Sequence, residues 1–442
     1  MRMKQYDSYK ESGVEWIGKV PSHWEIMPLK FTGTFGNGLT YSPKDVVDNG
    51  ILVLRSSNIQ NSSLSFEDNV YVSNVSKVLL VQKGDVIICS RNGSAALVGK
   101  SAFIDKDINA TFGAFMMRYI PKINKKYGFY LFQTAIGRYK GYFATTTINQ
   151  LTKSTIGEMK VPLANTEEQT AIVDFLDNKC SEIDKVISAQ QKRIALLQEL
   201  KQSVITHAVT KGLDPNVEMK DSGVEWIGKV PSHWQLIKIK NLKSKEPNAF
   251  VDGPFGSNLK SQHFIDNGDV YVIESGMITT GTFVYRDFKT ISKEHFKTIQ
   301  RSECREGDII IAKIGMNFGM AGELPKLDKH SVVSGNSLKL TLDRNKMRNL
   351  LFVYLLSVAK KNGGYVGLVQ ETAQPALSLG GLNGFALPVA PMAEQLDIEK
   401  YLIKRCTTID SSISKAQHQV ELLQEYKQSL ITEVVTGKCK VS

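Results

Sequence analysis

The sequence predicts a mixed α/β protein with an internal pseudo-two-fold repeat, in which two α/β modules are separated by two long helices that form an antiparallel coiled coil. Three observations carry this prediction. The string SGVEWIGKVPSHW occurs twice, letter for letter, at residues 12–24 and 222–234. Residues 161–212 align without a gap with residues 387–438, and both segments have a helical pattern. Between these shared segments the halves differ strongly, so a repeated frame holds two divergent inserts.

The repeat divides the chain into four parts. Residues 1–160 hold the first module, 161–213 the first long helix, 214–386 the second module and 387–442 the second long helix. Each insert mixes strand-like apolar runs with a later helical stretch. The expected strands are 51–54, 70–72 and 84–89 in the first insert, and 270–273, 308–312 and 337–342 in the second. The expected helices are 127–139 and 350–361.

The repeated block predicts a coiled-coil seam, because its apolar residues recur at alternating spacings of four and three. The seam residues are Leu176, Ile183, Ile187, Ile194 and Leu197 in the first helix, and Leu402, Ile409, Ile413, Val420 and Leu423 in the second. Thr166 with Gln169 predicts a capping box at the start of the first helix. Each helix would run for about 40 residues, or about 60 Å. Paired antiparallel, the helices would hold the inserts at opposite ends of a rod; the alternative is that each packs on its own module.

Composition indicates a partner and a compartment. The formal net charge of +11 and the pI of about 9.1 favour a polyanionic partner, most often nucleic acid. No apolar run reaches the roughly 18 residues that a membrane-spanning helix needs. The five cysteines are scattered singly, which argues against a disulfide framework or a zinc site. We therefore expect a cytoplasmic protein with no membrane partner.

Polar loops in both inserts supply candidate DNA-binding residues. Asparagine and glutamine can read adenine, and arginine and lysine can read guanine, through paired hydrogen bonds in the major groove. The same residue types are also ordinary loop formers. The candidates are Ser90, Arg91, Asn92, Thr146, Asn149, Gln150 and Lys153 in the first insert, and Lys313, Asn317, Gln370, Thr372 and Gln374 in the second.

No catalytic, cofactor-binding or metal-binding residues are predicted. Residues 93–101 resemble a phosphate-binding loop, but five residues separate the glycines where the motif has four. Methyltransferase and nuclease motifs are not found in the sequence. His23 and His233 lie in the duplicated string, where a structural role beside the neighbouring tryptophans is the simpler interpretation.

Taken together, these residues resemble the DNA-specificity subunit of type I restriction–modification systems. The resemblance rests on Glu15-Trp16-Ile17-Gly18 and its repeat, on residues 372–377 leading to Leu387-Pro388, and on the terminal Thr436-Gly437-Lys438. It covers nearly the whole chain, including the two-fold layout. The first half departs from the pattern at residues 147–151, which read TINQL where residues 373–377 read AQPAL.

The resemblance implies two target-recognition domains separated by two long conserved helices, with each domain reading one half of a split site in double-stranded DNA. It also implies that the helices set the spacer and dock two methyltransferase subunits, through which two motor-nuclease restriction subunits join. S-adenosylmethionine, ATP and Mg would belong to those partner subunits, and this chain would have no cofactor and no catalytic role. Three alternatives stay open: the specificity protein of a related fused restriction–methylation enzyme, a nucleotide-dependent enzyme, and a non-DNA scaffold built on a helical rod.

Overall fold

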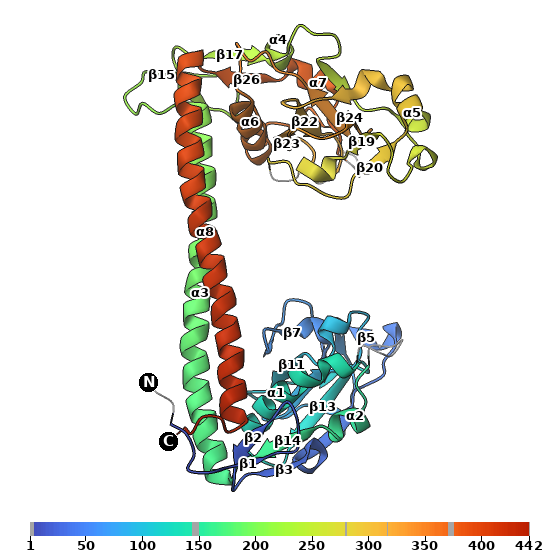
Figure 1. The fold of residues 1–442 in the computed structure, drawn as a ribbon, viewed down its shortest axis with the longest axis vertical. Coiled ribbons are helices and arrows are strands. Elements are labelled where there is room, and N and C mark those ends of the chain that lie inside the picture. Colours follow the sequence, from blue (N-terminus) through green and yellow to red (C-terminus); the bar gives the residue numbers. More distant parts are fainter. Residues whose placement is uncertain (1–3, 144–149, 279–280, 316, 370–374, 442) are drawn as a thin grey trace. The chain divides into compact units, whose positions relative to one another are not determined.

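The structure, a computed structural model, describes most of the chain, and Figure 1 labels many of its helices and strands. The residues outside the description are 1–3, 144–149, 279–280, 316, 370–374 and 442. The chain divides into two compact units. Unit 1 comprises residues 1–191 and 417–442, and unit 2 comprises residues 192–416. Each unit therefore holds one α/β module and one half of each long helix.

Unit 1 is built on two four-stranded sheets and three strand pairs. The first sheet has the order β11-β10-β13-β4, with β4 Gly33–Asn37, β10 Val86–Cys89, β11 Ser101–Phe103 and β13 Met116–Pro121. The second has the order β12-β6-β9-β5, with β5 Val46–Val47, β6 Ile51–Leu54, β9 Tyr71–Val72 and β12 Ala110–Phe112. The pairs are β1 Tyr9–Glu11 with β2 Lys19–Pro21, β3 Glu25–Pro28 with β14 Lys160–Leu163, and β7 Ile59–Gln60 with β8 Ser63–Leu64. The helices of this module are α1 Lys125–Phe143 and α2 Lys153–Gly157.

Unit 2 repeats this plan. Its first sheet has the order β23-β22-β25-β18, with β18 Phe250–Asp252, β22 Ile309–Ala312, β23 Ala321–Glu323 and β25 Ser337–Leu340. Its second has the order β20-β19-β24-β21, with β19 Val270–Ile273, β20 Lys289–Ile291, β21 Glu303–Cys304 and β24 His330–Val333. The pairs are β15 Met219–Asp221 with β16 Lys229–Pro231, and β17 Gln235–Lys238 with β26 Ala386–Val389. Its helices are α4 Ile239–Leu242, α5 Lys293–Thr298, α6 Asn349–Lys361 and α7 Leu379–Gly384.

The strands and helices expected in both inserts are confirmed. The apolar run at 84–89 forms β10 and its echo at 308–312 forms β22, and both strands lie inside their sheets, buried along their whole length. Gly84 (φ +94°) and Gly307 (φ +84°) turn the chain into these strands. Such left-handed backbone favours glycine, which explains why the echo retains it.

A buried ion pair also recurs in the two modules. Asp85 lies 3.6 Å from Arg118 on β13, and Asp308 lies 3.8 Å from Lys339 on β25. Burial raises the pKa of Asp85, while the backbone N–H of Gln82 and the charge of Arg118 oppose that shift. Removing one partner of such a pair would leave an uncompensated buried charge, so we regard the pair as part of the shared module core.

The two long helices are α3, Thr166–Lys211, and α8, Met392–Val435. The expected capping box is wrong: Asn165 is the cap, because its Oδ1 accepts the N–H of Glu168 at 2.9 Å. The Gln169 side chain is buried and instead donates to Ala164 O and accepts the N–H of Asn124. Asparagine is among the preferred N-cap residues, so the helix starts one residue after it.

Within each unit the two helices run antiparallel, side by side (Figure 1). In unit 1, Lys427 Nζ lies 2.7 Å from Asp184, and in unit 2, Lys201 Nζ lies 2.7 Å from Asp410. Asp184 aligns with Asp410 in the repeat, and Lys201 aligns with Lys427. The two ion pairs are therefore the same contact made twice, with the helices exchanging roles.

All ten seam positions are buried or half-buried. In unit 1, Leu176, Ile183 and Ile187 belong to the same apolar cluster as Leu430. In unit 2, Leu402 belongs to the same cluster as Ile205. The helix pair thus continues the core of each module, because the same clusters include β10 and α1 residues in unit 1 and β22 and α6 residues in unit 2.

Candidate nucleic-acid interface

The two candidate segments of the first insert meet at one end of the first sheet of unit 1. Residues 90–92 follow β10, and Arg91 forms an isolated antiparallel bridge with Gln150. The N–H of Leu151 donates to Ser90 O at 2.7 Å. Gln150 and Lys153 are exposed beside this bridge. Thr146 and Asn149 lie outside the described residues.

Unit 2 repeats the arrangement. Ile314, which follows β22, bridges Ala376, and the N–H of Leu377 donates to Lys313 O at 2.9 Å. Leu377 aligns with Leu151, so the two bridges occupy equivalent places in the repeat. Gln370, Thr372 and Gln374 precede this bridge but lie outside the described residues. In both modules, therefore, segments far apart in the sequence converge at the end of a central strand.

The side chains of residues 90–92 differ in direction. Ser90 is buried and its hydroxyl donates to Phe115 O at 3.0 Å, so it holds the loop rather than facing solvent. Arg91 is exposed, and its guanidinium lies 5.4 Å from the centre of the Phe115 ring. Asn92 is half-buried and donates from Nδ2 to Ser56 Oγ at 3.4 Å.

Lys313 has a different environment in unit 2. Its Nζ lies 3.8 Å from Asp252 and 3.8 Å from the centre of the Phe255 ring. Burial lowers the pKa of Lys313, and the charge of Asp252 opposes the shift. Asn317 is half-buried and its carbonyl accepts the N–H of Met320 at 3.0 Å. The cation of the second candidate interface, Lys313, is therefore partly neutralised by Asp252, whereas Arg91 in the first is more exposed.

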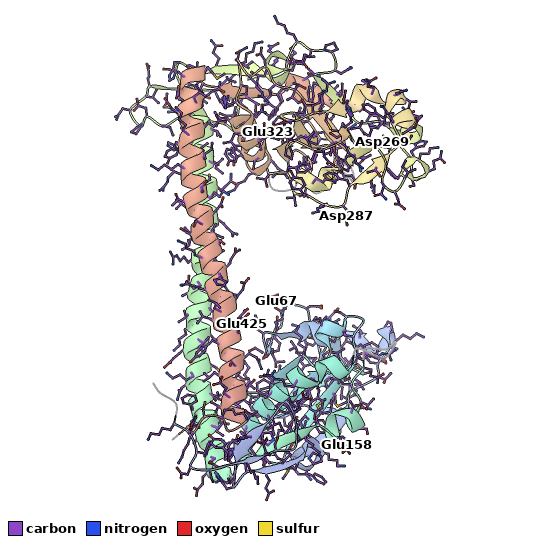
Figure 2. The ribbon with its side chains drawn as sticks, viewed as in Figure 1. Glu67, Glu158, Asp269, Asp287, Glu323 and Glu425 are labelled. Atoms are coloured by element: carbon purple, nitrogen blue, oxygen red, sulfur yellow. The ribbon has the colours of Figure 1, made fainter. Side chains whose placement is uncertain are left out.

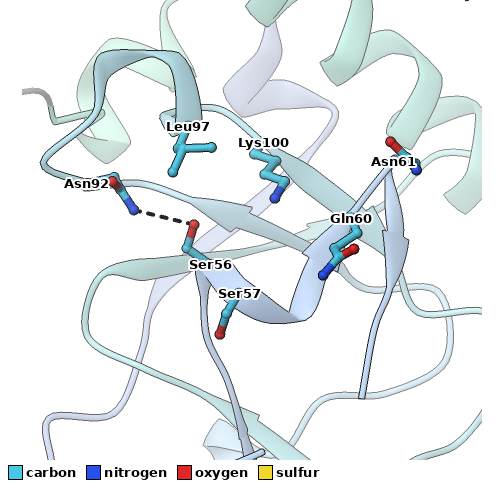
Figure 3. A pocket seen from close by; sticks show the side chains of 7 residues that line it. All are labelled: Ser56, Ser57, Gln60, Asn61, Asn92, Leu97 and Lys100. Carbon is cyan, nitrogen blue, oxygen red and sulfur yellow. Dashed lines mark hydrogen bonds between the residues drawn. The ribbon is translucent and has the colours of Figure 1, made fainter. Parts of the chain in front are cut away.

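A polar recess of about 570 Å³ lies beside residues 90–92 in unit 1. Figure 3 shows the side chains that line it, which come from the segment after β6, from β7 and the turn that follows it, and from the segment between β10 and β11. They are Ser56, Ser57, Gln60, Asn61, Asn92, Leu97 and Lys100. Amides, hydroxyls and one ammonium group offer both donors and acceptors, the groups that read base edges.

The duplicated string has a different role, which is to hold the ends of the helix pair. In unit 1, Glu168 in the first turn of α3 accepts a hydrogen bond from Trp24 Nε1 at 3.0 Å and contacts His23 Nε2 at 3.0 Å. In unit 2, Glu394 in the first turn of α8 accepts from Trp234 Nε1 at 3.0 Å, with His233 Nε2 at 2.8 Å. We call each Trp–His–Glu group a clamp.

Each clamp also borders the end of the partner helix. Gly437 follows α8 with φ +72°, and a Cβ there would lie 2.4 Å from Pro21 and 3.1 Å from Trp24. Gly212 follows α3 with φ +76° and lies against Glu394 and Trp234 in the same way. The identity of the two strings therefore has a structural reason: each must fit the start of one helix and the end of the other.

Other kinds of site are not evident in the described part of the chain. No group of three or more His, Cys, Asp or Glu side chains is placed to hold a metal ion there. Among the same residues, no helix combines the length and the apolar character needed to cross a membrane.

Sequence reasoning did not find Phe115, Phe255 or the residues that line the recess after β6. Their exposure depends on how loops cross the strand ends, and a single sequence carries no signal for that. Glu168 and Glu394 do have a signal, because they are retained in the repeat and each follows a Trp-containing string in its half. That pattern could have paired them with the tryptophans.

Known proteins share this organisation. The family model described as type I restriction modification DNA specificity domain matches residues 21–195. The specificity subunit of the type I restriction enzyme StySPI from Salmonella potsdam is 22% identical over 441 residues, covering 95% of this chain and 90% of the relative. The EcoKI specificity subunit from Escherichia coli K12 is 21% identical, with the same coverages.

A solved structure shares the fold. It comes from work on complex assembly and conformational transition of the type I restriction–modification system, and it covers 94% of this chain and 98% of its own, at a TM-score of 0.69 and 12% identity. The sequence comparison with the specificity subunits and the fold comparison with the solved structure each cover nearly the full length of this chain. Residues 21–195 thus match a type I restriction modification DNA specificity domain, and nearly the whole chain is similar to the specificity subunits of type I restriction enzymes.

Proposed function

We propose that the two modules read the two halves of a split, asymmetric site in double-stranded DNA. The observation that carries this proposal is the repeated strand-end bridge, Arg91 with Gln150 and Ile314 with Ala376, on two sheets of the same strand order. The framework is shared while the exposed side chains differ, as two readers of different half-sites require. Lysine and arginine contacts to phosphates would supply most of the affinity, and contacts to base edges would supply the specificity.

The helix pair would fix the unread spacer between the half-sites. Helix α3 has 46 residues and α8 has 44, which corresponds to about 65–70 Å each at 1.5 Å per residue. Each helix is continuous through the boundary between unit 1 and unit 2. The length of a helix grows by about 1.5 Å per residue, which suits a device that sets a distance.

The helices would also dock two methyltransferase subunits. Leu196 on α3 is 64% exposed and its repeat counterpart Leu422 on α8 is 49% exposed. Because the two leucines occupy equivalent places in the repeat, a contact that one copy of a partner makes at Leu196 could be made by a second copy at Leu422. Two restriction subunits would join through the methyltransferases, and these partners would bind S-adenosylmethionine, ATP and Mg. The assembly would work in the cytoplasm, where the DNA is.

Co-expression with a type I methyltransferase subunit that co-purifies with this chain tests the proposal. Single-molecule sequencing of host DNA should reveal a two-part motif carrying N6-methyladenine, present only when this chain is present. Exchange of residues 25–160 for those of a relative should change one half of that motif. A stable complex that adds no methylation, and that binds random and mapped duplexes equally, would instead support a scaffold.

A further inference from the structure

We propose that Phe115 in unit 1 and Phe255 in unit 2 stack on bases of the bound DNA, so that each module reads its half-site with an aromatic platform beside a cation. This inference deepens the proposed function and rests on it. Phe115 is 61% exposed and Phe255 is 48% exposed. Both lie at the strand ends where the interface bridges form.

The backbone of Phe115 is anchored while its ring is free to make contacts. Its carbonyl accepts hydrogen bonds from Ser90 N at 2.9 Å, Arg91 N at 3.1 Å and Ser90 Oγ at 3.0 Å. The Arg91 guanidinium lies over the ring at 5.4 Å from its centre. Arg91 is exposed, so a phosphate or a base can reach its guanidinium. Because the loop is already fixed, a ligand that contacts the exposed ring and the exposed guanidinium loses little conformational entropy on binding.

Phe255 reaches the same arrangement by another route. It follows β18 in a tight loop, in which a Cβ on Gly253 would lie 1.9 Å from Ser334 O. Asn258 N donates to its carbonyl at 3.0 Å, and Lys313 Nζ lies 3.8 Å from the centre of its ring. Phe115 and Phe255 do not occupy equivalent positions in the repeat. The N–H of Ser90 donates to Phe115 O, and the equivalent N–H of Lys313 donates to Asn336 O, so Asn336 is the counterpart of Phe115.

The same chemistry at non-equivalent positions favours a function over an inherited packing role. Neither ring fills a core, since each is about half exposed or more. Aromatic side chains stack on nucleic-acid bases, and phenylalanine is one of the residues that proteins insert between base steps to unstack them. Arginine or lysine beside the ring adds attraction for the phosphates.

Phe31 provides a control within the same module. It is 65% exposed, and Lys30 lies 5.3 Å from its ring centre, so ring and cation resemble those at Phe115. The two rings lie at opposite ends of the sheet, however. Phe31 lies near Gly33, which pairs with Pro121 at the last residue of β13, whereas Phe115 comes just before Met116, the first residue of β13. Lys30 is also neutralised by Glu158 at 2.6 Å, which Figure 2 labels.

The test measures DNA binding by the full chain assembled with its methyltransferase, on a duplex that carries the site mapped by methylation sequencing. Phe115→Ala and Phe255→Ala should each raise the Kd by about 5- to 150-fold, the range expected for loss of one base stack. Phe115→Leu should lose most of the same affinity, because leucine keeps apolar area but has no aromatic face. Phe31→Ala should change the Kd less than about twofold, as an exposed residue outside the interface.

A second readout reports stacking itself. Phe115→Trp should retain binding, and the site duplex should quench the fluorescence of the new indole, whereas Phe31→Trp should show no change. Alanine variants that bind within twofold of the parent, or a leucine variant that binds as well as the parent, would overturn the inference. So would an unquenched Phe115→Trp. Failure of the parent complex to prefer the mapped duplex over a scrambled one would instead refute the proposed function.

Discussion

Replacing Glu168 with alanine should loosen the start of α3 in unit 1, because Glu168 is the acceptor of the first clamp. The change removes a charged hydrogen bond from Trp24 Nε1, whose side chain is fully buried. A hydrogen bond to a charged group contributes about 1.5–3 kcal/mol, and the bond to the half-exposed His23 adds at most about 1 kcal/mol. We therefore expect a loss of about 1.5–4 kcal/mol in the free energy of opening this part of unit 1.

Hydrogen exchange with peptide resolution measures that loss locally, which matters because a chain of two units need not unfold in one step. A loss of 2 kcal/mol corresponds to about 30-fold faster exchange in the first turns of α3. Glu168→Gln, which keeps one acceptor oxygen, should lose about half as much. Glu167→Ala is the matched control, because Glu167 is exposed in the same turn and loses at most about 1 kcal/mol of helix-dipole stabilisation.

The duplication supplies an internal check on this reasoning. Glu394→Ala should produce the same acceleration at the start of α8 in unit 2, because Glu394 binds Trp234 as Glu168 binds Trp24. If amide hydrogens in the first turns of α3 exchanged at the same rate in Glu168→Ala as in Glu167→Ala, the stabilising role of the clamp would be refuted. An effect of Glu168→Ala spread evenly over both units would show that the clamp is not local.

Three further outcomes follow from the seam and the interface. Replacing Leu197 and Leu423 with Asp should place two carboxylates in the seam and abolish co-purification with the methyltransferase; assembly that survives would show that the seam does not hold the docking surface. Lengthening both helices in register should lengthen the spacer of the methylated motif, and an unchanged spacer would contradict a measuring role. Arg91→Ala should weaken DNA binding and lower the salt dependence of the Kd by about one ion, whereas Lys313→Ala, whose charge is shared with Asp252, should lower it less.

Much of the fold could be predicted because the repeat supplies its own alignment. The echo of β10 in β22 identified a shared central strand, and spacing alone located the ten half-buried or buried seam positions. Helix ends were harder to place, since Thr166 and Asn165 are both acceptable caps and only the fold decides between them.

The interface could be predicted only in outline. Residues 90–92 and Gln150 were candidates because they are polar, but the sequence did not predict that they come together, and the direction of each side chain depends on how the loops cross. Ser90 faces inward because the carbonyl of Phe115 lies within reach. The exposure of the Phe115 ring depends on where β13 begins. Hydrophobic patterning leaves that boundary undefined by a few residues.

The sharing of both helices between units also sets an order for folding during synthesis. The first module is made before the second, but the residues that cover its half of the seam, including Leu430 and Val434, are made only after the second module. The Asp184–Lys427 ion pair spans 243 positions, and the Lys201–Asp410 pair spans 209. Until α8 has been made, the apolar seam residues of α3 have no partner helix, and they can then aggregate or bind a chaperone. The core of unit 1 can therefore be completed only after α8 has been made, although its α/β module is translated before that of unit 2.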